Sequence, residues 1–194
     1  ISAGSVHTYR IVVVALVPAA LPANASDCDL GAGEDGTGFL NTATVTQNGQ
    51  GRSDDACSQP AVVEVDKEVV GEPVRQGDDV SIRYAITVTN PGTTDTAYDL
   101  ADELRFGEGI EVLAATVSNV DPGSIATNPA WDGRSDTGIV EAEPIGAGAT
   151  HRYEVVVQAR VGTLATDASS DCTLDEGETG TGLLNTAEVT VEGR

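Results

Sequence analysis

The chain has few basic residues. Among its 194 residues, ten are Lys or Arg and 31 are Asp or Glu, so that the formal net charge is −21. A nucleic-acid-binding protein needs a basic surface to neutralise phosphates, so this composition argues against a nucleic-acid partner. A strongly acidic surface repels other copies of itself, which is typical of proteins that stay soluble outside the cell.

Histidine, cysteine and long apolar runs are also scarce. The two histidines, His7 and His151, lie beside no Ser or Cys motif, and no glycine-rich loop opens a helix, so we predict no site that turns over an external substrate. The absence of a CxxC pair argues against a zinc site. No stretch is long enough to span a membrane. The apolar run 11–23 lacks the basic start of a signal peptide, so we interpret it as strand and loop.

Residues 1–50 repeat as residues 145–194, with 25 identities in 50 positions, an offset of 144 and no gap. The strongest match joins GTGFLNTATVT at 36–46 to GTGLLNTAEVT at 180–190. We therefore predict a tandem repeat of 144 residues, of which this chain is a piece. In this division, residues 1–57 are the C-terminal strands of one unit plus a linker, and 58–194 are nearly all of the next. Tandem units of this kind suggest a rod or stalk.

In the second unit, apolar and polar residues alternate with period two between turn signals rich in Gly, Pro and Asn. No segment has a helical period. The pattern predicts seven strands, over 62–70, 79–90, 97–104, 111–118, 137–141, 151–161 and 182–192. Seven short strands in one unit predict an all-β fold of the immunoglobulin-like β-sandwich type, in which Trp131 packs in the core or at an edge. Two further strands, 7–17 and 38–47, are expected in the first unit.

The odd number of cysteines follows from the repeat. Cys28 and Cys57 lie on either side of the last predicted strand of the first unit, so we predict a disulfide between them. Cys172, the counterpart of Cys28, would then need a partner 144 residues after Cys57, which lies beyond this sequence. The alternative is three buried free thiols. A disulfide would indicate an oxidising, extracellular environment.

The only lysine, Lys67, stands in the alternating segment VEVDKEV at 63–69, where it shares a face with three valines. A buried ammonium is costly, but a lysine amine, unlike a guanidinium, can lose its proton and become nucleophilic. The same alternation turns Asp102 and Asn185 inward on their own strands. In an immunoglobulin-like sandwich the first and last strands can lie side by side, so these three polar residues could meet in the core.

These three residues, if buried together, could react with one another. Burial lowers the pKa of a lysine and raises that of a carboxylic acid. Neutral Lys67 could attack the amide carbon of Asn185 and expel ammonia while Asp102 shuttles the proton, which leaves an isopeptide bond. This would be a single-turnover reaction of the domain with itself, so no enzyme acting on a separate substrate is implied. The alternative is an ordinary Lys67–Asp102 salt bridge, with Asn185 satisfying backbone groups.

Four segments carry a resemblance to a known group: VDKEV at 65–69, GDDVSIRYAITVTN at 77–90, YDLADEL at 98–104 and LNTAEV at 184–189. With them the chain resembles the isopeptide-forming pilin and adhesin repeat domains on the surface of Gram-positive bacteria, actinobacteria especially. The resemblance implies a Lys67–Asn185 bond with Asp102 as the acid. Because Arg105 stands where the family often has proline, Glu103 is a second candidate for the acid.

The resemblance implies a structural stalk domain of a secreted or wall-anchored bacterial adhesin or pilus-like protein, located outside the cell. Its partners would be neighbouring repeats, with the cell wall or a host surface by analogy. Asn41 is the counterpart of Asn185, so strands of residues 1–50 could also swap into another copy, where Asn41 would compete for Lys67. The alternative function is an adhesin module that binds a ligand, a glycan or Ca²⁺ without a crosslink. No cofactor is expected, although the acidic loop 171–178 offers oxygen ligands for Ca²⁺.

Overall fold

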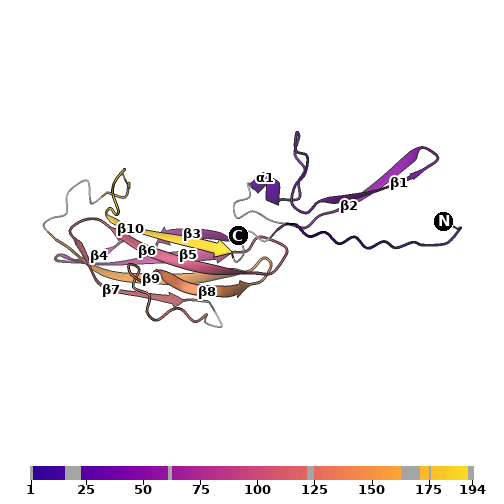
Figure 1. Ribbon diagram of the computed structural model, residues 1–194. Helices are drawn as coiled ribbons and strands as arrows, with labels where there is room; N and C mark the ends of the chain where they lie inside the picture. The colour runs from indigo at the N-terminus through magenta and orange to yellow at the C-terminus, as the bar shows by residue number, and fades with distance from the viewer. Residues whose placement is uncertain are drawn as a thin grey trace.

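The computed structural model describes residues 2–15, 23–60, 63–121, 125–162, 171–174 and 176–191. These residues form a β-sandwich and an N-terminal region that projects from one end of it (Figure 1). Within them, no helix is long and apolar enough to cross a membrane. The prediction of an all-β fold is confirmed.

The sandwich consists of two antiparallel sheets. The larger sheet has the order β3-β5-β9-β7, with the short strand β4 also paired to β5, and the smaller sheet has the order β10-β6-β8. The strands are β3 (Glu64–Val69), β4 (Val74–Gln76), β5 (Asp79–Thr89), β6 (Thr96–Phe106), β7 (Ile110–Asn119), β8 (Gly138–Ile145), β9 (Thr150–Val161) and β10 (Leu183–Val191). Strands β3 and β10 are therefore end strands of different sheets.

The core follows from alternation along the strands. Every second side chain points between the sheets and loses its contact with water, which favours folding by about 1.5–3 kcal/mol for each large apolar side chain. On β5 and β9 these inward residues are at most 7% exposed: Val80, Ile82, Tyr84, Ile86, Val88, Tyr153, Val155, Val157 and Ala159. All seven strands predicted for the second unit are present, with ends within four residues of those expected. Only β4 was not predicted there.

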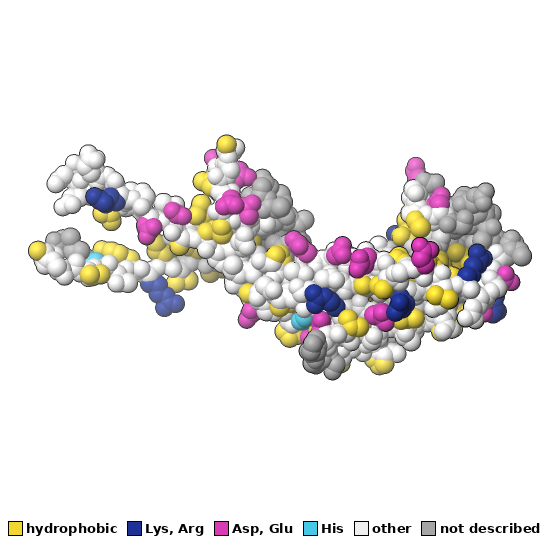
Figure 2. Space-filling model, turned by 180° about the vertical axis from the view of Figure 1, so that it is seen from behind, with side chains coloured by type: hydrophobic (Ala, Val, Ile, Leu, Met, Phe, Trp, Pro, Cys, Tyr) yellow, Lys and Arg dark blue, Asp and Glu magenta, His cyan; other side chains and the backbone are white. Residues whose placement is uncertain are grey.

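The N-terminal region differs from its prediction. The expected strand 7–17 does not form over 7–15, and the rest of it lies outside the described residues. Residues 2–15 instead form an extended arm whose apolar side chains face solvent; Val6 is 86% exposed and Val14 96% (Figure 2). A one-turn helix, α1 (Ala23–Ser26), follows where none was expected.

A β-hairpin completes this region. Strand β1 (Asn41–Gln47) forms most of the predicted strand 38–47, and β2 (Gln50–Ala56) pairs with it residue by residue. The two turn residues, Asn48 and Gly49, have positive φ angles of 50° and 76°. Such angles at both turn positions are typical of a tight hairpin with the sequence Asn-Gly.

The two matching halves of the repeat also share local structure. In the first, the Thr37 hydroxyl donates hydrogen bonds to the carbonyl and the carboxylate of Asp27 (2.8 and 2.7 Å). In the second, the Thr181 hydroxyl donates to the carbonyl and the carboxylate of Asp171 (3.0 and 3.1 Å). Both threonines are buried. The loop that precedes the last matching strand is therefore built in the same way twice.

Candidate crosslink site

Three strands position the candidate residues. Asp102 lies on β6 and Asn185 on β10, and their register pairs Asn185 with Leu104 and Asp102 with Ala187. Asp102 and Asn185 are thus diagonal neighbours on one face of the smaller sheet, within reach of each other. Lys67 lies on β3 of the other sheet. Strand β3 contacts β10 without pairing with it (Figure 1). The first and last strands of the unit therefore lie together, as predicted.

All three side chains point inward. Lys67 Nζ donates a hydrogen bond to Asp102 Oδ2 and forms an ion pair with it. The Asp102 side chain is fully buried, and that of Lys67 is 13% exposed. Asn185 is 8% exposed as a residue. The structure thus brings together a potential nucleophile, an acid and an amide in a nearly water-free space.

Burial controls the charge of the pair. It lowers the pKa of the Lys67 amine, although the nearby Asp102 carboxylate raises it. It also raises the pKa of the Asp102 carboxyl, against the opposing effects of Lys67 and of the Asn185 amide. Both net shifts favour the uncharged forms, because a low-dielectric interior disfavours ions. The amine is therefore shifted towards its nucleophilic form and the carboxyl towards its proton-donating form.

Among the described residues, the amide of Asn185 has no hydrogen-bond partner. Its Nδ2 and Oδ1 atoms are buried without a hydrogen-bond partner, and so is Asp102 Oδ1. The amide is nevertheless close enough to Asp102 to lower the pKa of that carboxyl. The two groups therefore face each other in an arrangement that falls short of a hydrogen bond.

Two aromatic side chains hold the strands around the site. The Tyr84 hydroxyl donates to the Leu183 carbonyl, two residues before Asn185, and the centre of its ring lies 5.2 Å from Lys67 Nζ. Trp131 is 5% exposed, and its indole Nε1–H donates to the Asp102 carbonyl oxygen at 3.1 Å. Tyr84 and Trp131 therefore connect the site to β5 and to the loop before β8. The sequence indicated only that Trp131 packs in the core or at an edge.

The other predicted residues lie away from the site. Glu103 is exposed, because successive residues of a strand face opposite sides, so this second candidate for the acid points away from Lys67. Asn41 is exposed at the start of β1, outside the sandwich. The predicted disulfide between Cys28 and Cys57 is present, and Cys172 is an exposed free thiol.

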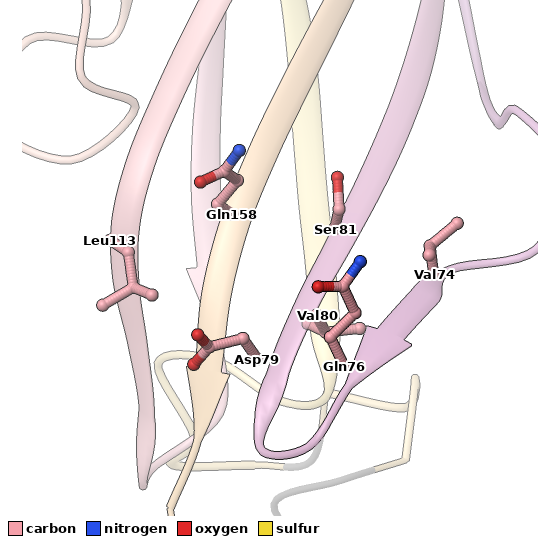
Figure 3. A pocket seen from close by; sticks show the side chains of 7 residues that line it. All are labelled: Val74, Gln76, Asp79, Val80, Ser81, Leu113 and Gln158. Atoms are coloured by element: carbon pink, nitrogen blue, oxygen red, sulfur yellow. The ribbon is translucent and has the colours of Figure 1, made fainter.

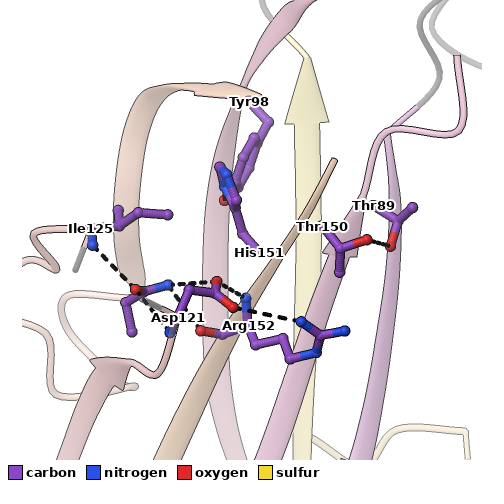
Figure 4. A network of polar contacts seen from close by, with 8 residues as sticks. Thr89, Tyr98, Asp121, Ile125, Thr150, His151 and Arg152 are labelled. Carbon is purple, nitrogen blue, oxygen red and sulfur yellow. Dashed lines mark hydrogen bonds and ion pairs between the residues drawn. The ribbon is translucent and has the colours of Figure 1, made fainter. Parts of the chain in front are cut away.

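Other polar features of the sandwich have structural partners. The shallow pocket in Figure 3 lies over the larger sheet, between Val74 on β4 and Leu113 on β7. Figure 4 shows the start of β9, where the Asp121 carboxylate accepts a hydrogen bond from the Arg152 backbone N–H at 2.6 Å. His151 Nδ1 lies 2.9 Å from the Tyr98 hydroxyl. His151 therefore belongs to a network with Tyr98 and Tyr153, whose hydroxyl oxygens lie 2.6 Å apart.

No metal centre emerges from the part of the chain that the structure describes, because no group of three or more His, Cys, Asp or Glu is placed to hold an ion. In the acidic loop 171–178, the Asp171 carboxylate accepts hydrogen bonds from Thr181 and from the Thr173 backbone. Residue 175 of this loop lies outside the described residues.

Comparisons of the chain with protein-family models, with curated proteins and with solved structures found no match.

Proposed function

We propose that the sandwich is a structural stalk domain whose first and last strands are joined by an isopeptide bond between Lys67 and Asn185. The observation that carries the proposal is the joint burial of Lys67, Asp102 and Asn185, with an amide that has no hydrogen-bond partner in the part of the chain that the structure describes. Buried polar groups are normally satisfied, and each one left unpaired costs about 1–3 kcal/mol. A salt bridge would account for Lys67 and Asp102, but not for the unpaired amide that faces them.

The bond would form by exchange of one amide for another. The neutral Lys67 amine attacks Cγ of Asn185, and protonated Asp102 stabilises the charge that develops on Oδ1. Asp102 then transfers a proton to the Asn185 nitrogen and takes one from the attacking amine. The bond from Cγ to Nδ2 breaks, ammonia leaves, and the new bond joins Lys67 Nζ to Cγ. Asp102 ends in the state in which it began.

The position of the bond suits a protein under tension. It would connect end strands of different sheets, which share no hydrogen-bond ladder. Lys67 and Asn185 are separated by 118 residues. A force applied near the ends of the unit would load the pairs of β3 with β5 up to Asp66 and the pairs of β10 with β6 from Val191 back to Thr186, and would then pass through the covalent bond. The strands between the two residues would stay folded under load.

The repeat supports an arrangement of the chain in tandem units, and the disulfide supports a location outside the cell. The 144-residue offset and the shared Thr–Asp hydrogen bonds favour an array of similar units. The Cys28–Cys57 disulfide favours an oxidising environment, as for a secreted or wall-anchored bacterial surface protein. In this proposal the chain is part of an adhesin or pilus-like stalk whose partners are its neighbouring repeats.

The mass of the intact, reduced and folded chain tests the crosslink. The proposal predicts a mass lower than that of the sequence by one ammonia, and the full mass for Lys67→Arg. A guanidinium keeps its proton, so the variant retains a cation at the site but no nucleophile. A folded wild-type chain with the full mass would contradict the crosslink.

A further inference from the structure

The outer edge of β10 and the thiol of Cys172 each have a counterpart in the first copy of the repeat, and each counterpart has a partner there. Strand β10 is an end strand of the smaller sheet, and Cys172 is exposed and unbonded. At the offset of 144 residues, β10 corresponds to β1 and Cys172 to Cys28. In that first copy the strand has a neighbour, β2, and the cysteine has a disulfide partner.

The pairing in the first copy is regular. Strand β2 runs antiparallel to β1 from the pair Asn41–Ala56 to the pair Gln47–Gln50, and the next residue, Cys57, bonds to Cys28. Five of the seven residues of β1 are identical at 185–191. One of the two differences places Glu188 at the position of Thr44, whose hydroxyl lies 3.0 Å from that of Ser53. A carboxylate there could accept the same serine proton.

The space for the disulfide is also prepared. A Cβ on Gly38 would lie 2.4 Å from the Asp27 carbonyl oxygen and 3.3 Å from Cys57 Sγ, so this position has room only for glycine. Gly38 has a φ of 47°, and its counterpart Gly182 has a φ of 45°. In the second copy, a cleft of about 540 Å³ opens beside Gly182 and is lined by Cys172 and Leu183. The cleft also borders apolar residues of the larger sheet, among them Val69 and Val80, so that Cys172 and Gly182 lie at the mouth of an open space between the two sheets.

We propose that the outer edge of β10, with Cys172, is an acceptor site for a strand of the kind formed by Gln50–Ala56: short, polar, acidic and followed by a cysteine. Its backbone would extend the smaller sheet beyond β10, and its cysteine would form a disulfide with Cys172. In an array, the occupant is the strand that leads from one unit into the next. The inference deepens the proposed stalk function, on which this choice of occupant rests.

The first copy shows what such a strand does at a junction. Ser58, the residue after Cys57, accepts a hydrogen bond from the Phe39 N–H through its carbonyl at 2.8 Å. Its hydroxyl lies 2.8 Å from that of Thr93, in the connection between β5 and β6 of the sandwich. The strand after the hairpin turn thus joins the disulfide of one unit to the body of the next.

Both backbone hydrogen bonds and the disulfide would hold the added strand on β10. An added strand gains affinity from the unpaired N–H and C=O groups of an edge, and its side chains give specificity. The covalent step is a thiol–disulfide exchange. The Cys172 thiolate attacks a disulfide between the incoming cysteine and a small thiol. The new S–S bond forms as the old one breaks, and the small thiol leaves as a thiolate, so that no further oxidant is required.

A peptide with the sequence of residues 48–58 tests the site on the full chain. Its cysteine is activated as a mixed disulfide with a small aromatic thiol, and capture is followed by intact mass. We expect the rate of capture to be at least about tenfold higher than for a peptide with residues 48–56 scrambled, equivalent to about 1.4 kcal/mol. The adduct should disappear on reduction and should not form with Cys172→Ala, which controls for exchange at Cys28–Cys57.

Hydrogen exchange then locates the bound strand. In the adduct, backbone amides on the outer edge of β10 should exchange more slowly than in an adduct of the scrambled peptide. Equal capture rates for the two peptides, or protection elsewhere than on β10, would overturn the proposal. If strand β3 already covers the outer edge of β10, the two peptides should be captured at equal rates. The crosslink is read separately as the loss of ammonia, so failure of one proposal is distinguishable from failure of the other.

Discussion

Replacement of Asn185 by alanine should separate the crosslinked sandwich from the uncrosslinked one. The bond would close a loop of 118 residues between Lys67 and Asn185. Closure of a loop of this length removes conformational entropy from the unfolded chain worth about 5 kcal/mol. For a domain of about 130 residues this corresponds to a melting temperature lower by roughly 15–20 °C in the variant. The Asn185 amide has no hydrogen-bond partner among the described residues, so lost hydrogen bonds should add little to the effect of losing the crosslink.

Asn41→Ala is the matched control, because Asn41 is the counterpart of Asn185 but is exposed and outside the sandwich. Thermal unfolding followed by circular dichroism should show a large decrease for Asn185→Ala and no change for Asn41→Ala. The wild type and Asn41→Ala should both lack one ammonia, and the monomer of Asn185→Ala should have its full mass. Equal melting temperatures and full masses for all three proteins would refute the reasoning.

Three further predictions concern other parts of the chain. Replacing Cys57 by serine should expose the amides of β1 and β2 to hydrogen exchange, because the disulfide spans 29 residues and such a loop is worth roughly 3.5 kcal/mol; unchanged protection would show that the hairpin holds without it. In the Asn185→Ala variant, Asn41 of a second copy should bond to Lys67 in place of the missing Asn185 and give dimers that resist boiling in detergent, whereas only monomers would dismiss the strand swap. Burial raises the pKa of Tyr153 to about 12, so the folded state keeps a proton that an unfolded tyrosine releases near pH 10. The free energy of unfolding should therefore fall as the pH rises from 10 towards 12, less so in Tyr153→Phe, and a denaturant midpoint that stays constant over this range would contradict it.

The sandwich strands were predictable because their environment repeats along the sequence. A strand between a core and solvent must alternate, so that period two gave both the strands and the inward direction of Lys67, Asp102 and Asn185. The same rule excludes Glu103, which stands next to Asp102 and must face the other way. The repeat supplied the disulfide, because it placed Cys28 and Cys57 around one strand.

Which segments pair with a neighbouring strand could not be predicted from alternation. Residues 7–15 match β9, which forms a strand between β5 and β7, yet in the arm they pair with no strand among the described residues. Tyr9 is 82% exposed, whereas its counterpart Tyr153 is 1% exposed. Strand formation depends on the neighbours that a strand packs against, more than on its own residues. The reverse holds for β2, which has a polar sequence and was missed, although Asn48-Gly49 is a strong hairpin signal.

The partners around the site also required the structure. Trp131 was expected in the core or at an edge, but the hydrogen bonds of Tyr84 to Leu183 and of Trp131 to Asp102 join segments far apart in the sequence. The missing hydrogen bonds of Asn185 were likewise invisible, because only the folded structure shows which polar groups the core leaves unpaired.

Peptide mapping of the folded, reduced wild-type chain by tandem mass spectrometry can show whether Lys67 and Asn185 are bonded. An Asn-Gly pair such as Asn48-Gly49 can also lose ammonia when its side chain closes a ring with the backbone. The position of the loss therefore distinguishes this reaction from the Lys67–Asn185 bond. The account predicts a branched peptide in which the side chain of Lys67 is joined to that of Asn185, with one ammonia missing. Two linear peptides, with Lys67 and Asn185 unmodified, would contradict it.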